Sequence, residues 1–159
     1  MTIFIGVEWT EIWKFRKADY NGFITKVCAT ILPGSKIMAS GSYWPGLHKN
    51  YEFIASEQMM YWKILKSWPE NQKPDYFKGT SEEFLNRQNI DFFIADEEML
   101  SGGLYQKEIF MSYFEKHCEF SSEFSDEFYN HSSYARKKSP IPFKISILKK
   151  THQFRNPLP

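Results

Sequence analysis

Histidine and cysteine, the side chains that most often carry nucleophilic or metal chemistry, are few in this chain and poorly spaced for either. His117 is followed directly by Cys118, but adjacent residues on a helix point about 100° apart and make a poor catalytic pair. A structural metal site needs about four ligands at turn-like spacing, and no C-x-x-C, H-x-x-x-H or H-E-x-x-H spacing occurs. We therefore predict no catalytic residue, no metal ligand and no cofactor.

Two weaker patterns point to hydrolases. The tripeptide His131-Ser132-Ser133 resembles one half of a paired His-x-Ser/Thr phosphoesterase signature, but neither His48 nor His152 has Ser or Thr two positions later. Glu8 with Glu11, or the triplet Asp96-Glu97-Glu98, could supply the two carboxylates of a glycosidase, whose separation in space a sequence does not give. A small hydrolase with carboxylate chemistry is accordingly the third of our functional hypotheses.

Charge is sorted by position along the chain. Residues 96–127 hold nine acidic and two basic residues, a net charge of −7, whereas residues 128–159 hold seven basic residues and no acidic one. Residues 1–95 are nearly neutral, and the whole chain has a net charge of +1. Two alternatives remain open: the two segments neutralise each other in the fold, or an acidic surface is kept bare for a charged partner.

An acidic helix face can imitate a nucleic-acid backbone and occupy the cationic cleft of another protein. Our leading hypothesis is a non-enzymatic binding protein that inhibits or neutralises a protein partner with a basic surface. In size and composition the chain resembles small bacterial immunity proteins and phage-encoded inhibitors, and the resemblance implies a compact binding domain. The predicted contact residues are Glu108, Glu115, Glu119, Glu123 and Asp126, with Asp96, Glu97 and Glu98 as a secondary patch.

The basic segment supports the alternative hypothesis of a nucleic-acid-binding protein or small nuclease. Its basic residues interleave with Tyr134, Phe143 and Phe154, which is the composition of a groove that follows a phosphate backbone and stacks bases. The sequence pI of about 7.7 is far below the basic values typical of such domains, so this hypothesis ranks second. The residues that it would use are Arg136, Lys137, Lys138, Lys149 and Lys150.

The composition indicates one globular domain over residues 1–159. A chain of this length buries about 70% of its unfolded surface, and 15 Phe, 9 Tyr and 5 Trp supply a large apolar core. No apolar run approaches the roughly 18–20 residues that span a bilayer, so we expect no membrane partner. The N-terminal residues show no secretory signal pattern, and Cys28 and Cys118 do not make a disulfide framework. We therefore expect a cytoplasmic protein.

The elements that must position these residues are predicted to form a single-domain α+β fold with an N-terminal antiparallel meander. Residues 1–55 are rich in β-branched and aromatic residues, separated by Pro-Gly and Asn-Gly pairs that are typical of turns. The predicted strands are 3–15, 23–32, 36–44 and 51–55, with turns at Asn21-Gly22, Pro33-Gly34 and Pro45-Gly46.

Residues 56–130 are predicted to be mainly helical, with a strand near 90–95. Two short helices begin at sequence signals for N-caps: Ser56 before 57–67, and Thr80 with Glu83 as a capping box. Residues 106–129 are predicted as one long amphipathic helix, because their aromatic side chains fall within an arc of about 120° and their acidic ones on the opposite side. Residues 131–159 are expected to form a basic C-terminal strand and tail.

Overall fold

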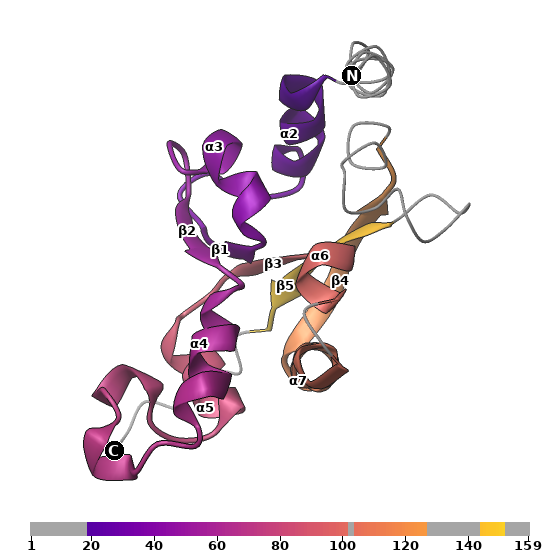
Figure 1. Ribbon diagram of the computed structural model, residues 1–159. Helices are drawn as coiled ribbons and strands as arrows, with labels where there is room; N and C mark the ends of the chain where they lie inside the picture. The colour runs from indigo at the N-terminus through magenta and orange to yellow at the C-terminus, as the bar shows by residue number, and fades with distance from the viewer. Residues whose placement is uncertain (1–18, 102–103, 127–143, 152–159) are drawn as a thin grey trace, which may run out of the picture.

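The computed structural model describes residues 19–101, 104–126 and 144–151, and these form an α+β fold around a single mixed sheet (Figure 1). The five strands have the order β2-β1-β3-β5-β4 across the sheet. β1 pairs in parallel with both β2 and β3, whereas β5 runs antiparallel to its two neighbours, β3 and β4. The strand bounds are β1 Lys36–Ala39, β2 Glu52–Ala55, β3 Phe92–Ala95, β4 Cys118–Phe124 and β5 Ile145–Lys150.

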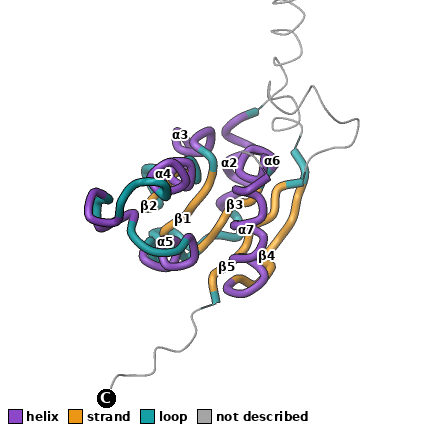
Figure 2. The backbone as a smooth tube through the Cα atoms, turned by 60° about the horizontal axis from the view of Figure 1, so that its bottom comes forward, coloured by secondary structure: helices purple, strands orange, loops and turns teal. Residues whose placement is uncertain are grey.

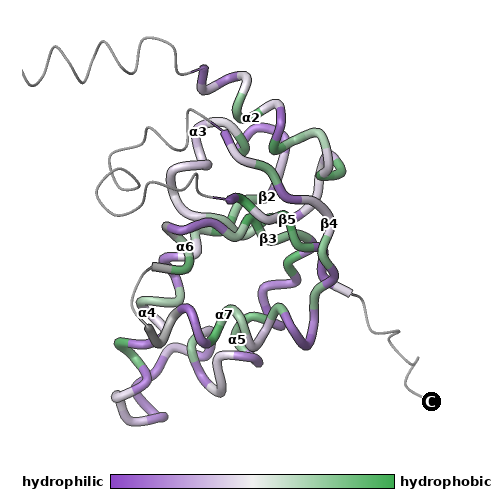
Figure 3. The backbone as a smooth tube through the Cα atoms, turned by 90° about the vertical axis from the view of Figure 1, so that its right-hand side faces the viewer, coloured by the Kyte–Doolittle hydropathy of each residue, from purple (hydrophilic) through white to green (hydrophobic). Residues whose placement is uncertain are grey.

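Helices cover both faces of this sheet, which therefore forms the middle of three layers (Figure 3). One face packs against α2 and α3, and the other packs against α4, α5 and α7 (Figure 2). The helices are α2 Tyr20–Cys28, α3 Trp44–Leu47, α4 Gln58–Leu65, α5 Ser81–Arg87, α6 Glu97–Ser101 and α7 Leu104–His117, with 3₁₀ turns at Gly41–Tyr43, Glu70–Gln72 and Asp75–Phe77.

The core consists of two buried clusters, one on each face of the sheet, because successive side chains of a strand point to opposite faces. In β1, Ile37 and Ala39 join the cluster under α2, whereas Met38 joins the cluster under α4, α5 and α7. All three are fully buried. The strands thus have apolar residues on both faces, as expected of a sheet that is covered by helices on both sides.

The predicted N-terminal antiparallel meander is wrong. Residues 20–28, which were expected to form a turn and part of a strand, form helix α2, and β1 and β2 run parallel with α3 between them. The buried residues of α2 are Phe23, Ile24 and Val27, spaced as on one face of a helix. The Asn21-Gly22 pair lies in its first turn, so it does not form a hairpin. The strand expected at 3–15 falls outside the described residues.

The predicted long helix over 106–129 is also wrong. Helix α7 ends at His117, and Cys118–Phe124 continue as strand β4 at the edge of the sheet. The carbonyl of His117 accepts hydrogen bonds from the backbone N–H and the hydroxyl of Thr151, just after β5. The chain therefore leaves the helix where it meets the end of a strand with which it can pair.

Several local signals are confirmed. Thr80 and Glu83 form the reciprocal bonds of a capping box at the start of α5, β3 lies within the strand expected near 90–95, and β5 provides the C-terminal strand. Gly34 has a φ of +81°, which fits the position that a type II turn reserves for glycine. By contrast, Ser56 does not cap α4, which begins at Gln58 and receives no side-chain cap.

Candidate partner-binding site

The acidic and basic segments pair with each other where the structure describes both. Strand β4 lies beside β5, and the Lys144 ammonium lies 2.6 Å from Glu123 Oε1. Glu119 stands opposite Lys149 in the strand register, with 3.7 Å between the charged atoms. Two of the five main acidic contact residues predicted from sequence therefore neutralise the basic strand.

Two further predicted contact residues are buried. The Asp126 carboxylate, 8% exposed, forms an ion pair with Lys26 of α2. Asp96 is 1% exposed directly after β3, and its Oδ1 accepts a hydrogen bond of 2.7 Å from the Met99 backbone N–H at the start of α6. Glu97 is exposed in α6, while the side chain of Glu98 lies outside the described part. The two buried carboxylates stabilise the fold rather than face a partner.

Glu108 and Glu115 are predicted contact residues that the exposed face of helix α7 does present. Both lie on α7, and their spacing of seven residues places them on the same side as Ser112. The opposite side of α7 carries Phe110, Tyr113 and Phe114 into the core. An acidic helix face thus exists, but it is confined to α7 and is shorter than expected.

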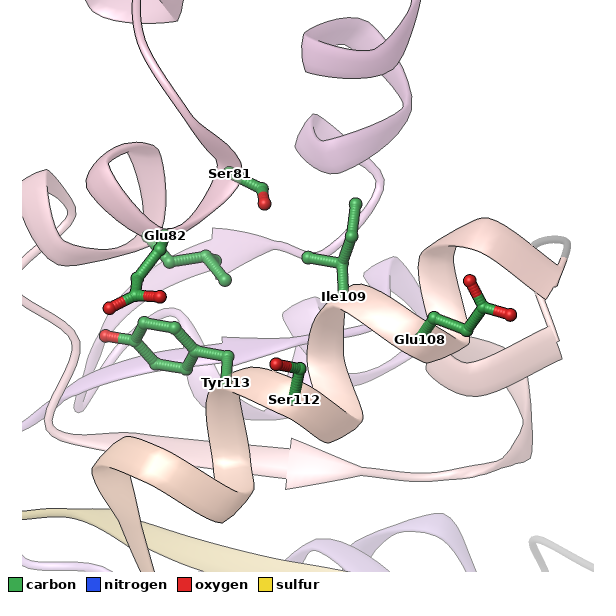
Figure 4. A pocket seen from close by; sticks show the side chains of 7 residues that line it. Ser81, Glu82, Glu108, Ile109, Ser112 and Tyr113 are labelled. Atoms are coloured by element: carbon green, nitrogen blue, oxygen red, sulfur yellow. The ribbon is translucent and has the colours of Figure 1, made fainter.

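A pocket of about 220 Å³ lies between this face of α7 and helix α5 (Figure 4). We call it the α5–α7 pocket. Its apolar wall consists of Leu85, Ile109 and the ring of Tyr113. The polar side chains around it are Ser81 and Glu82 from α5 and Glu108 and Ser112 from α7.

Contacts between the two helices hold the walls of the α5–α7 pocket in place. Glu82 Oε1 lies 2.9 Å from His117 Nε2, and Glu82 Oε2 accepts a hydrogen bond of 3.3 Å from Lys116. These two hydrogen bonds lower the pKa of Glu82 below its ordinary value, and the bond to His117 has the larger effect. The hydroxyl of Tyr113 donates to Asn86 Oδ1 at 2.8 Å, and burial of this ring raises the pKa of its phenol. The carboxylate and the aromatic wall are therefore preorganised.

A second exposed feature lies on helix α4 and the turn that follows it. Met59 and Trp62 face the core, while Met60, Tyr61, Ile64 and Trp68 each expose between 48% and 55% of their surface. We call these four residues the α4 apolar surface. The sequence predicted this helix, but its apolar outer side was missed. The signal was available, because apolar residues surround the whole helix instead of following one stripe.

The described part of the predicted nucleic-acid surface consists of Lys149 and Lys150 on β5. Lys149 pairs with Glu119, as above, and also lines a second pocket with Asp91 near the start of β3. Lys150 is half-buried with its ammonium 5.8 Å from the centre of the Tyr113 ring, and burial lowers its pKa. Arg136, Lys137 and Lys138 lie outside the described residues.

Among the described residues, no three His, Cys, Asp or Glu side chains are grouped to hold a metal ion. The same part of the chain contains no helix with the length and apolar character needed to cross a bilayer. Comparison with known proteins adds no family: no family model, no curated protein and no solved structure matches the chain.

Proposed function

We propose that this chain is a non-enzymatic binding module that docks on a protein partner and thereby inhibits or neutralises it. The observation that carries the proposal is the α4 apolar surface. Tryptophan, tyrosine and methionine are the residue types enriched in the centres of protein interfaces, where a few aromatic anchors supply most of the binding energy. Three of the four residues in this surface are of those types.

The size of the α4 apolar surface supports an interaction role. Its four residues together expose roughly 450 Å², given the areas of such residues. This is the size of the largest apolar patch on a typical monomer, about 300–600 Å², and such patches are often functional. A standard interface buries about 800 Å² on each partner. The α4 apolar surface would therefore supply about half of one interface, with the rest from neighbouring elements.

The exposed acidic residues of α7 provide a second contribution. Helices α4, α5 and α7 form one layer on the same face of the sheet, so a single partner can touch more than one of them. Glu108 and Glu115 would favour a partner with basic groups and repel acidic ones. The apolar surface would then supply affinity, and the acidic residues would select for a basic partner.

Capture of the partner with matched variants tests the proposal. Wild-type protein should recover a stoichiometric protein from nuclease-treated native lysate, and Ile64→Glu should lose it. Leu32→Glu should retain it, because Leu32 is exposed but lies outside the α4 apolar surface. Binding to the purified partner is then measured for all three proteins.

Three results would contradict this assignment of function. Equal capture by wild type and Ile64→Glu would remove α4 from the interface. A wild-type dimer that Ile64→Glu converts to a monomer in light scattering would assign the surface to self-association. Recovery of nucleic acid alone in a parallel capture from lysate without nuclease treatment, with binding that collapses as salt rises, would favour the nucleic-acid hypothesis, which otherwise stays a prediction.

A further inference from the structure

We infer that the α5–α7 pocket binds an organic cation on an apolar stem, namely the side chain of one lysine or arginine of the protein partner. The inference rests on the proposed function for the source of that side chain. The size, walls and charges of the pocket determine which type of chemical group it can bind. Free amines carry the same chemistry, and the experiment below separates the two sources.

The size of the pocket suits one side chain. Its volume of about 220 Å³ is below the roughly 300–1,000 Å³ that is typical of small-molecule sites. It is open at the surface between two helices, where a residue projecting from a partner can enter (Figure 4). A side chain that fills such a depression at an interface is a common binding anchor.

The walls match the stem of a lysine or arginine. These side chains lay their methylene groups along apolar surface and keep the charged head near polar groups. Ile109 is partly exposed and provides an aliphatic contact, and the nearly buried side chains of Leu85 and Tyr113 complete the apolar lining. The hydroxyls of Ser81 and Ser112 can accept hydrogen bonds from an ammonium or a guanidinium.

The charges lining the pocket select a cation. Two of the described residues that line the pocket, Glu82 and Glu108, carry carboxylates, and none of these described lining residues is basic. Lys116 and His117 lie just outside and bond to Glu82, so they offset part of its charge. Glu108 is exposed and lies at the other side of the pocket in Figure 4. It is therefore the carboxylate on which selection of a cation depends most.

Titration with small capped residues tests the inference without the partner. The probes are Nα-acetyl-lysine-N-methylamide, the arginine analogue and the norleucine analogue, which has a similar stem and no charge. Two-dimensional NMR should show saturable shifts at Ile109 and Tyr113 with the first two probes and much weaker binding of the third. n-Butylammonium, added separately, represents a free amine and should bind no more tightly than the lysine probe, because the two share the apolar stem and the ammonium.

Glu108→Gln and Glu115→Gln form a matched pair of variants. Both residues are exposed on the same side of α7, but only Glu108 lines the pocket. Loss of one partly exposed charge pair should weaken binding of the lysine probe about two- to fivefold in Glu108→Gln. Glu115→Gln should bind as wild type does. Thermal unfolding of both variants checks that the fold is retained.

Three other results would contradict the inference. Equal affinity for the norleucine probe would show an apolar pocket without charge selection, and equal loss in the two variants would show only a general field effect. Much tighter binding of n-butylammonium than of the lysine probe would show that a peptide backbone hinders entry and would assign the site to free amines. Ile64→Glu should leave probe binding unchanged, so failure of the α4 interface and failure of this pocket can be distinguished.

Discussion

Reversing one charge across strands β4 and β5 should destabilise the fold, and exchanging both charges should restore it. In the wild type, Glu123 Oε1 and Lys144 Nζ are 2.6 Å apart and partly exposed. Glu123→Lys removes an attraction worth about 0.2–1 kcal/mol and adds a repulsion of similar size. We expect a loss of about 1 kcal/mol in the free energy of unfolding, which lowers Tm by about 2–4 °C in a protein of this size.

Urea unfolding at low and high salt measures this effect. The double variant Glu123→Lys/Lys144→Glu should recover most of the lost stability, because the pair is re-formed with its charges exchanged. In 1 M salt the Debye length is about 3 Å, so the differences should shrink. Glu115→Lys is the control, since Glu115 lies outside β4 and should change stability by less than about 0.5 kcal/mol. A single reversal with the wild-type midpoint, or a double variant no more stable than the single one, would refute the pairing argument.

Three further outcomes follow from particular contacts. Thr80→Ala removes the capping box of α5 and should cost about 1 kcal/mol in urea unfolding, whereas Thr80→Ser should cost little. Because His117 and Lys116 lower the pKa of Glu82, its ionised form stabilises the folded state above the ordinary carboxyl pKa of about 4.3. Wild type should therefore exceed Glu82→Gln in stability near pH 5–6, and this difference should disappear as the pH falls through the lowered pKa. Burial raises the pKa of Cys118 to about 11, which lowers the fraction of reactive thiolate at pH 8. Iodoacetamide should therefore alkylate Cys118 on the order of 100-fold more slowly in the folded than in the urea-unfolded chain. Mass spectrometry in a Cys28→Ala background measures both rates.

The helix at residues 20–28 illustrates how local turn chemistry can mislead. Asn-Gly is a strong hairpin signal between two strands, and the β-branched residues after it favoured a strand. The apolar residues Phe23, Ile24 and Val27, however, are spaced three and four apart. They pack on the sheet as one helical face. Tertiary burial of this face outweighs the weak local preferences of its residues.

Strand β4 was missed for a different reason. Phe120 and Phe124 are four residues apart, and a spacing of four fits both the repeat of a helix and the alternation of a strand. The helical phase that begins with Phe110 and Phe114 therefore seemed to continue through them. What selects the strand is the neighbouring strand β5, some 20 residues later in sequence, with which β4 pairs through a register shift between Phe120 and Ser122. Such a long-range pairing is not encoded in a local period.

The sequence predicts the helical positions of some residues in the α5–α7 pocket but not how they come together. The capping box located the first turn of α5, and therefore the position of Glu82, while Glu108 was among the predicted contact residues. The proximity of Glu82 and Glu108 could not be predicted from sequence, because it depends on the packing of α5 against α7 over the sheet. The outer side of α4 was missed because an apolar residue in a helix pattern is normally assigned to the core.

The pairing of β4 with β5 explains part of the separation of acidic and basic residues along the chain. Two strands that approach from distant parts of the sequence meet correctly only if one register is favoured. Glu119 opposite Lys149 and Glu123 beside Lys144 favour the observed register, because a slip would separate these pairs. Acids in β4 and bases in β5 would then serve pairing specificity. Among the described acidic residues of the segment, Glu97 on α6 and Glu108 and Glu115 on α7 are exposed outside this strand pair and remain placed to meet a partner.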